Sequence, residues 1–566
     1  IAKKITLFLR LNKNLKIIIF SVLLLIISFI FYFLNLLNLK NLEFFSLVIF
    51  YLFFLLGISK LIVKSYYCNV NKIKKKLNTL NIYDLIFFII LINIFLSCLV
   101  PVTDGDSVRY HLGQFNYYQK FSKFDLHSKI SYIGDGLNII SYYSSSLNII
   151  SCLNFYYLFN LLKIINKSFS FEKKYFFTIF VLSIPIYLNL LISQKPFIWL
   201  IFNLFFIFYL SQNKMIKFQS ISFALILINL SLIQITKPEF LVIAPIFIIF
   251  LLIKMNINFN FLKKCEQKNI FTILISISFF PLIFFIYNFF EFSDPTKILL
   301  TQNNIAEERF VEFLKNPNLS FTFSNILEFF LNLGIPIKYF DNFPVSLGIG
   351  FFICVIFSKF NFSKEYIFVI CLILINLIFY RFGIDHNHSR NYILIYLIII
   401  YLFLQKEINY KKYIKIILLS QLIITQISFV YFNSEIYFKK NYNNISYNYI
   451  NENLILKNVK NLEETIIITE IDGNLFKKYD FINIDYFNFA KKVYFEEIAN
   501  ILKFSDYTNI YLIFKNDIFF NPISNYKVNE IELVNNTRNP FKRSKKKFNI
   551  YKIPKNNFAN LVFKFN

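Results

Sequence analysis

Long apolar runs recur along most of the chain, with short polar segments between them. Most runs hold about 17–25 residues, the length that a helix needs to cross a bilayer. We expect about thirteen such helices, at residues 17–37, 42–63, 83–100, 137–163, 175–193, 196–212, 219–236, 239–254, 270–290, 343–358, 365–380, 391–405 and 413–432. The first run lacks a small-residue cleavage site, which favours an uncleaved transmembrane helix over a signal peptide. The pattern predicts a mainly α, polytopic transmembrane helix bundle.

The lysines between the runs predict an orientation. Residues 1–16 carry lysine and arginine without any acid, and the segment from Lys64 to Lys76 carries five lysines without any acid. Lysine pairs at 173–174, 263–264 and 411–412 fall in later alternate loops. The positive-inside rule then places the N-terminus in the cytoplasm. The loop after residue 100, the long loop at about 291–342 and the tail are expected on the extracytoplasmic side.

The tail changes character from about residue 433. Its runs ETIIITEI and TNIYLIFKND are rich in β-branched and aromatic residues, which favours short strands. We expect three parts: an N-terminal pair of transmembrane helices with basic cytoplasmic segments (1–82), a transmembrane core (83–432) and a small extracytoplasmic α/β domain (433–566).

Composition agrees with a membrane protein and argues against a nucleic-acid partner. Of the 566 residues, 56% are hydrophobic and 16% are charged, with a formal net charge of +27. The lysines lie mostly in short loops between apolar runs, where they set membrane orientation. We expect the lipid bilayer, and no nucleic acid, as a partner, with the chain in a bacterial-type inner membrane.

A few charged residues do not serve orientation, and all fall at the expected extracytoplasmic ends of helices. A charge at the membrane face is costly unless it is paired, so such residues are functional candidates. They are Asp104, Asp106, Arg109, His111, Lys195, Lys237, Glu239, Arg381, Asp385, His386, His388 and Arg390. Acids and bases at one mouth suggest a polar cavity for an anionic ligand embedded in the membrane, and phosphate suits arginine and lysine.

The segments TDGDSVRYHL, SQKP, TKPE and SRNYILIY carry a family resemblance. Together they resemble the GT-C superfamily of polytopic glycosyltransferases, in particular bacterial relatives of the protein O-mannosyltransferases and the lipid A aminoarabinose transferases. The resemblance covers about residues 83–432, and its most specific piece is the aspartate pair followed by Tyr-His-Leu.

The resemblance implies an inverting transfer of a sugar, a hexose or a pentose, from a polyprenyl-phosphate donor to a glycan, lipid or protein acceptor at the extracytoplasmic face. The family's loop aspartate is the general base, which assigns that role to Asp104. Asp106 is expected to orient the acceptor, or to share a Mg²⁺ or Mn²⁺ ion with Asp104; no cofactor is otherwise expected. The candidate substrate-binding residues are Arg109, Tyr110, His111, Lys195, Lys237, Arg381, His388 and Arg390.

Simpler roles compete with several of these assignments. Arg109 lies three residues after Asp106 and is suited to a local ion pair. His111 is suited to fixing the loop by hydrogen bonding, and two histidines at i and i+2 without a third ligand are weak evidence for a metal. Lys195 and Lys237 are also suited to extending from helix ends to the membrane interface.

Two other functions compete with glycosyl transfer. An O-antigen-type polymerase or ligase also joins lipid-linked sugars at the outer face, but does not require the aspartate pair. A non-enzymatic lipid-sugar transporter or flippase would favour ionisable residues near the bilayer midplane and helices broken by glycine or proline. The chain has only 10 glycines, and its candidate charges fall at the extracytoplasmic ends of helices and not at the midplane. Both features favour the enzyme over the transporter.

Overall fold

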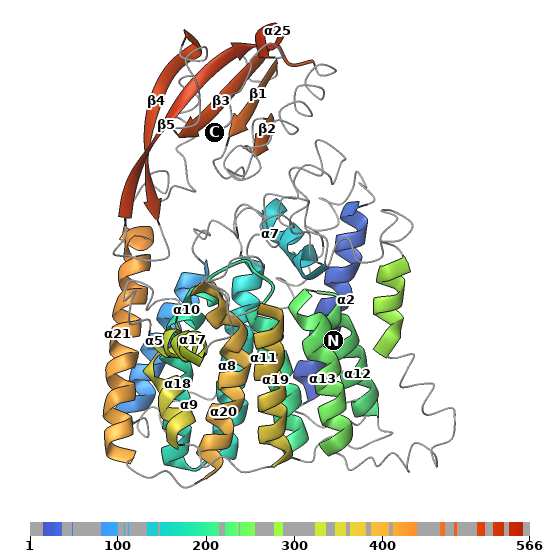
Figure 1. The fold of residues 1–566 in the computed structure, drawn as a ribbon, viewed down its shortest axis with the longest axis vertical. Coiled ribbons are helices and arrows are strands. Elements are labelled where there is room, and N and C mark those ends of the chain that lie inside the picture. The colour runs from blue at the N-terminus through green and yellow to red at the C-terminus, as the bar shows by residue number, and fades with distance from the viewer. Residues whose placement is uncertain are drawn as a thin grey trace, which may run out of the picture. The chain divides into compact units, whose positions relative to one another are not determined.

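The chain folds into a mainly helical part and a small β-sheet (Figure 1). The computed structural model describes residues 15–36, 48, 81–99, 107, 111, 133–144, 148–213, 221–236, 238–254, 277–286, 323–335, 346–357, 363–380, 386–406, 411–438, 464–469, 480–483, 506–515, 525–536 and 543–558. The first compact unit comprises 1–100, 132–301 and 311–430, and the second comprises 101–131, 302–310 and 431–566.

Helices of the first unit lie side by side along much of their length (Figure 1). Their bounds are α2 Lys16–Leu36, α5 Ile82–Leu99, η3 Ile133–Leu137, α7 Asn138–Ser144, α8 Ile149–Ser168, α9 Phe171–Leu182, α10 Pro185–Leu191, α11 Ile198–Gln212, α12 Ile221–Gln234, α13 Pro238–Lys254, α17 Phe323–Gly334, α18 Ile349–Phe357, α19 Lys364–Tyr380, η6 His386–Tyr392, α20 Ile393–Gln405 and α21 Lys411–Phe438. Two of them, α11 and α20, are buried over almost their whole length.

The prediction of about thirteen membrane-spanning helices is wrong for the part of the chain that the structure describes. There, two helices are long and apolar enough to cross a bilayer, at Ile82–Leu99 and Lys411–Val430, or three if one bent pair counts as a span. The other apolar helices offer segments of 10–17 residues. At about 1.5 Å per residue, these are shorter than the hydrocarbon core of about 30 Å. The expected helix at 42–63 lies almost wholly outside the described residues.

The expected helix at 175–193 is two helices that meet at an angle of 69°. Its second half, α10, begins with Pro185, which has no N–H to continue the hydrogen-bond ladder of α9. The residue before a proline is also disfavoured in the helical region, and Ile184 is extended. The break therefore follows from a proline inside an otherwise apolar run.

The expected helix at 137–163 is also interrupted. It consists of the 3₁₀ turn η3, the short helix α7 and, after a gap, α8. The turn η3 packs closely against α2. Gly136 permits this approach, since a Cβ atom there would clash with the backbone carbonyl of Ser28. Overall apolarity does not reveal such a contact, which one glycine permits.

Two side chains from α21, Gln421 and Thr425, bind backbone groups at the break between α9 and α10. Gln421 donates from Nε2 to the carbonyl of Ser183 over 2.7 Å, and its Oε1 accepts the backbone N–H of Gly350 over 2.8 Å. Thr425 Oγ1 also donates to the Ser183 carbonyl, over 3.1 Å. Gly348, with φ of 84°, leaves room for the amide, since a Cβ atom there would clash with it. Backbone groups freed by the break thus find partners on a neighbouring helix.

Five strands of the second unit form one sheet in the order β2-β1-β3-β5-β4. The bounds are β1 Thr465–Thr469, β2 Asp480–Asn483, β3 Asn509–Lys515, β4 Lys527–Asn536 and β5 Arg543–Pro554, followed by α25 Lys555–Phe558. β1 pairs in parallel with β2 and β3, and β5 pairs antiparallel with β3 and β4. All five residues of β1 are buried, as expected of an inner strand covered on both faces. Both runs that the sequence predicts as strands are strands, β1 and β3.

We predict that Gln421→Leu destabilises the first unit. The leucine leaves the buried Gly350 N–H without its partner and removes one of the two donors to Ser183. An orphaned buried group costs about 1–3 kcal/mol, so the midpoint of thermal denaturation in detergent should fall. Ser420→Ala is the control, since this exposed hydroxyl bonds only the Ile416 carbonyl of its own helix. Equal midpoints for the two variants would contradict the role of Gln421.

Candidate functional site

Oppositely charged side chains pair at one end of the helices of the first unit. Lys174 lies 3.2 Å from Asp84, Lys411 lies 3.1 Å from Glu172, and Lys254 pairs with Glu365. Lys173 Nζ donates to the Lys406 carbonyl over 3.0 Å. These contacts join the N-terminal ends of α5, α9, α19 and α21 to the C-terminal ends of α13 and α20. We call this set the paired end.

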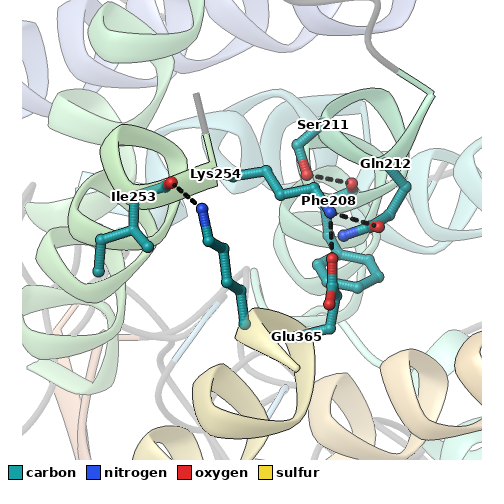
Figure 2. Close-up of polar contacts among 7 residues, drawn as sticks. Phe208, Ser211, Gln212, Ile253, Lys254 and Glu365 are labelled. Carbon is teal, nitrogen blue, oxygen red and sulfur yellow. Dashed lines mark hydrogen bonds and ion pairs between the residues drawn. The ribbon is translucent and has the colours of Figure 1, made fainter. Parts of the chain in front are cut away.

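The pair of Lys254 and Glu365 is the least exposed of these ion pairs (Figure 2). Lys254 Nζ also donates to Gln212 Oε1 over 3.2 Å, and Lys364 Nζ donates to the Ile253 carbonyl over 3.0 Å. Side-chain exposure is 26% for Lys254 and 14% for Glu365, compared with 54% and 69% for Lys411 and Glu172. The cluster fastens α11, α13 and α19 together where solvent screens their charges least.

Lys195 lies away from the paired end, in the turn between α10 and α11. Its residue is only 3% exposed. A lysine that extends to the membrane interface would keep its ammonium group in water, so burial within the protein argues against that simpler role. A buried cation is costly to desolvate, so Lys195 depends on the polar groups around it.

Buried side chains of α7 and α8 hold this turn. Asn154 donates to the Leu191 carbonyl over 3.1 Å and accepts the Trp199 N–H over 3.0 Å. Ser151 donates to the Ile192 carbonyl over 3.0 Å and accepts from Gln194 over 2.9 Å. Asn138 Nδ2 donates to the Gln194 carbonyl over 2.9 Å. The position of Lys195 is therefore set by a hydrogen-bonded support.

The SQKP and TKPE segments approach each other around Gly134. A Cβ atom at Gly134 would lie 2.9 Å from Pro196 Cγ and 3.5 Å from the Thr236 carbonyl. Pro196 follows Lys195, and Thr236 precedes Lys237, which itself lies outside the described residues. The structure thus brings two of the predicted segments together at the level of the backbone.

The end of η6 carries buried polar atoms that have no hydrogen-bond partner among the described residues. These atoms are Arg390 Nε, both side-chain atoms of Asn391, and Tyr392 Oη. Asn391 is 4% exposed and Tyr392 is 1% exposed. Each unpartnered buried group costs about 1–3 kcal/mol, so a run of three such residues needs a compensating interaction.

η6 and the Lys195 turn are linked through α10. The short helix η6 contacts α10, which leads directly into that turn. η6 also precedes α20, whose C-terminal residue Gln405 adjoins the paired end, so η6 lies at the other end of α20. We call the turn of residues 192–197 together with η6 the open end. Its buried lysine and its guanidinium donor suit an anion that accepts several hydrogen bonds.

The remaining predicted site residues are placed less completely. Asp104, Asp106, Arg109, Tyr110, Lys237 and Arg381 lie outside the described residues, and His388 is described only as part of the backbone of η6. His111 is buried and belongs to the second unit. No group of three metal-ligating side chains occurs among the residues that the structure describes, and the aspartate pair is not among them.

The predicted site residues leave out the polar residues that support the site and part of the site itself. Ser151 and Asn154 occur inside an apolar run that predicts a plain membrane helix. Asn391 adjoins Arg390 and is not among the predicted site residues. A polar residue that interrupts an apolar run was the available signal.

Comparisons with protein-family models, with curated proteins and with solved structures found no match for the chain.

We predict that Glu365→Gln destabilises the protein more than Glu172→Gln does. The first change leaves the half-buried Lys254 without its anionic partner, and the second breaks an exposed pair. We expect a loss of about 1–3 kcal/mol for Glu365→Gln and about 0–1 kcal/mol for Glu172→Gln. Thermal denaturation of both variants in the same detergent measures the difference, and an equal loss would show that the partly buried pair has no special role.

Proposed function

We propose that the chain is a membrane glycosyltransferase that moves a sugar from a polyprenyl-phosphate donor to an acceptor at the extracytoplasmic face. Lys195 and Arg390 bind the phosphate of the donor, and Asp104 is the general base that activates the acceptor with inversion at the anomeric carbon. The acceptor is a glycan, a lipid or a protein.

The observation that carries this proposal is the run of buried polar atoms at the end of η6, which begins with Arg390 Nε and has no partner among the described residues. Lys195 is a buried cation in the turn that follows α10, the helix that η6 contacts. A phosphate accepts several charge-assisted hydrogen bonds from such donors, and its charge offsets the cost of burying them.

Apolar surface on the helices supports a lipid environment. On α5, Ile82 is 67% exposed, and Phe88 and Ile89 are each 59% exposed. On α21, Ile427 is 64% exposed and Ile423 is 57% exposed. Apolar faces of this extent on both of the long apolar helices mark contact with a membrane or a partner, and they suit a donor held by a polyprenyl chain.

In the proposed chemistry, a carboxylate acts as the general base and cations stabilise the leaving phosphate. Asp104 removes the proton of the acceptor nucleophile as it attacks, and the sugar develops oxocarbenium character. The leaving group is a lipid phosphate, a weak base that needs positive charge more than it needs a proton. Asp106 orients the acceptor, or shares a Mg²⁺ or Mn²⁺ ion with Asp104.

We predict that the paired end is cytoplasmic and that the sheet is extracytoplasmic. Lysines near α21 and in the other basic loops support this orientation. Cysteines introduced at Lys412 and at Lys547, both exposed, should react with a membrane-impermeant maleimide from opposite sides of intact membrane vesicles. Reaction of both positions from one side would contradict the orientation.

We predict that Asp104→Asn abolishes most of the sugar transfer while the donor still binds. The amide has nearly the size of the carboxylate but cannot accept the acceptor's proton. General-base catalysis contributes about 10²–10⁴-fold, so transfer from a polyprenyl-phosphate sugar in purified membranes should fall by that order. Asp106→Asn should reduce transfer less, unless the reaction requires a metal ion. In that case transfer should fall strongly, and added Mg²⁺ or Mn²⁺ should partly restore it.

Glu172→Gln is the matched control for Asp104→Asn, because it neutralises an acid in an exposed ion pair at the paired end. Its transfer rate should equal that of the wild type. Transfer by Asp104→Asn at the rate of this control would refute the general-base assignment. Movement of the intact lipid-linked sugar across vesicles, without transfer, would favour a flippase instead.

A further inference from the structure

Asn391 differs from the other buried asparagines of the first unit. Asn154 and Asn229 use both atoms of their amides: Asn154 bonds the Leu191 carbonyl and the Trp199 N–H, and Asn229 bonds the Ile18 carbonyl and Asn203. Asn391 is 4% exposed, yet neither Nδ2 nor Oδ1 has a partner among the described residues. Asn138 and Asn203 leave Oδ1 without a partner among the described residues but use Nδ2. In Asn391 both amide atoms lack a partner among these residues.

The surroundings of Asn391 are those of a binding site. Arg390 precedes it, and Tyr392, whose buried Oη also lacks a partner among the described residues, follows it. The ring of Tyr392 packs edge-on against Phe329 of α17, with centroids 5.8 Å apart, which fixes the phenol. The contact between η6 and α10 places these residues near the Lys195 turn. Three consecutive residues thus offer unused hydrogen-bonding atoms beside a cation.

The chemistry of these atoms restricts the ligand. Arg390 Nε and Asn391 Nδ2 are donors, which phosphate oxygens and hydroxyl oxygens can accept. Asn391 Oδ1 is only an acceptor, so a phosphate diester, which has no proton, cannot satisfy it. The complement is an anion with neighbouring hydroxyl groups, which both donate and accept. A glycosyl phosphate has this combination.

We propose that Asn391 is a specificity-determining residue that binds neighbouring hydroxyl groups of the donor's sugar, with Tyr392 Oη as a second contact. The inference rests on the proposed function and deepens it, because Arg390 holds the phosphate and Asn391 distinguishes a glycosylated lipid phosphate from a bare one. The acceptor and the general base do not enter this discrimination.

The test compares two kinds of probe on the purified full chain in detergent. One is a short-chain polyprenyl phosphate, and the other is the same lipid phosphate carrying mannose, glucose or arabinose. The wild type should bind at least one glycosylated form about tenfold more tightly than the bare form. In Asn391→Leu, which keeps the approximate size without the amide, that ratio should fall to near one while affinity for bare lipid phosphate is unchanged.

Arg390→Gln is the matched control and should weaken both probes in parallel. If Asn391→Leu does not fold, Tyr392→Phe removes a single hydroxyl and should lower the ratio by a smaller factor. A ratio that stays at the wild-type value in a folded Asn391→Leu protein overturns the inference. If that variant is also more stable to heat than the wild type, the amide of Asn391 binds a water molecule instead of a sugar. Wild-type protein that binds neither probe would instead refute the proposed function.

Discussion

The fold of the first unit depends on satisfying backbone groups where apolar helices break. Pro185 ends the hydrogen-bond ladder between α9 and α10, and in an apolar environment the freed carbonyls need partners from the protein. Gln421 supplies one of them and at the same time holds the N-terminal end of α18. Because this contact fixes the break, α10 can leave the direction of α9 by 69° and end in the turn that carries Lys195.

The same principle separates structural from functional polar groups. Asn154, Ser151 and Gln421 are buried and hydrogen-bonded to neighbouring helices, so they stabilise geometry. The residues at the end of η6 are equally buried but keep unpartnered atoms among the described residues. At the paired end, charges are neutralised locally. Other buried atoms of the described residues also lack partners, but at η6 three consecutive residues do, and this run is the candidate place for a ligand.

The sequence predicted where much of the helix lies, but not where the apolar runs break into separate helices. Apolar runs identified where helices lie, yet mean apolarity is the same for a straight helix and for one that Pro185 breaks or that Gly136 allows to approach α2 closely. Among the described residues, the number of membrane spans was overestimated mainly because most apolar helices offer segments of only 10–17 residues, and because one expected span is a bent pair. Strands β1 and β3 were visible because β-branched residues cluster in them.

The motifs located part of the candidate site. SQKP and SRNY led to Lys195 and Arg390, whereas the importance of Asn391 depends on which groups surround it, and a sequence does not show that. Asp104 and Asp106 lie outside the described residues, so their roles rest on the sequence.

The central claim is that the open end, and not the paired end, receives a lipid phosphate. A photoreactive short-chain polyprenyl phosphate, cross-linked to the full chain and mapped by mass spectrometry, tests it directly. The account predicts labelled peptides from residues 192–197 and 386–392, with labelling reduced by excess unmodified lipid phosphate. Labelling centred on residues 172–174 and 364–365, or spread without competition along α5 and α21, would contradict it.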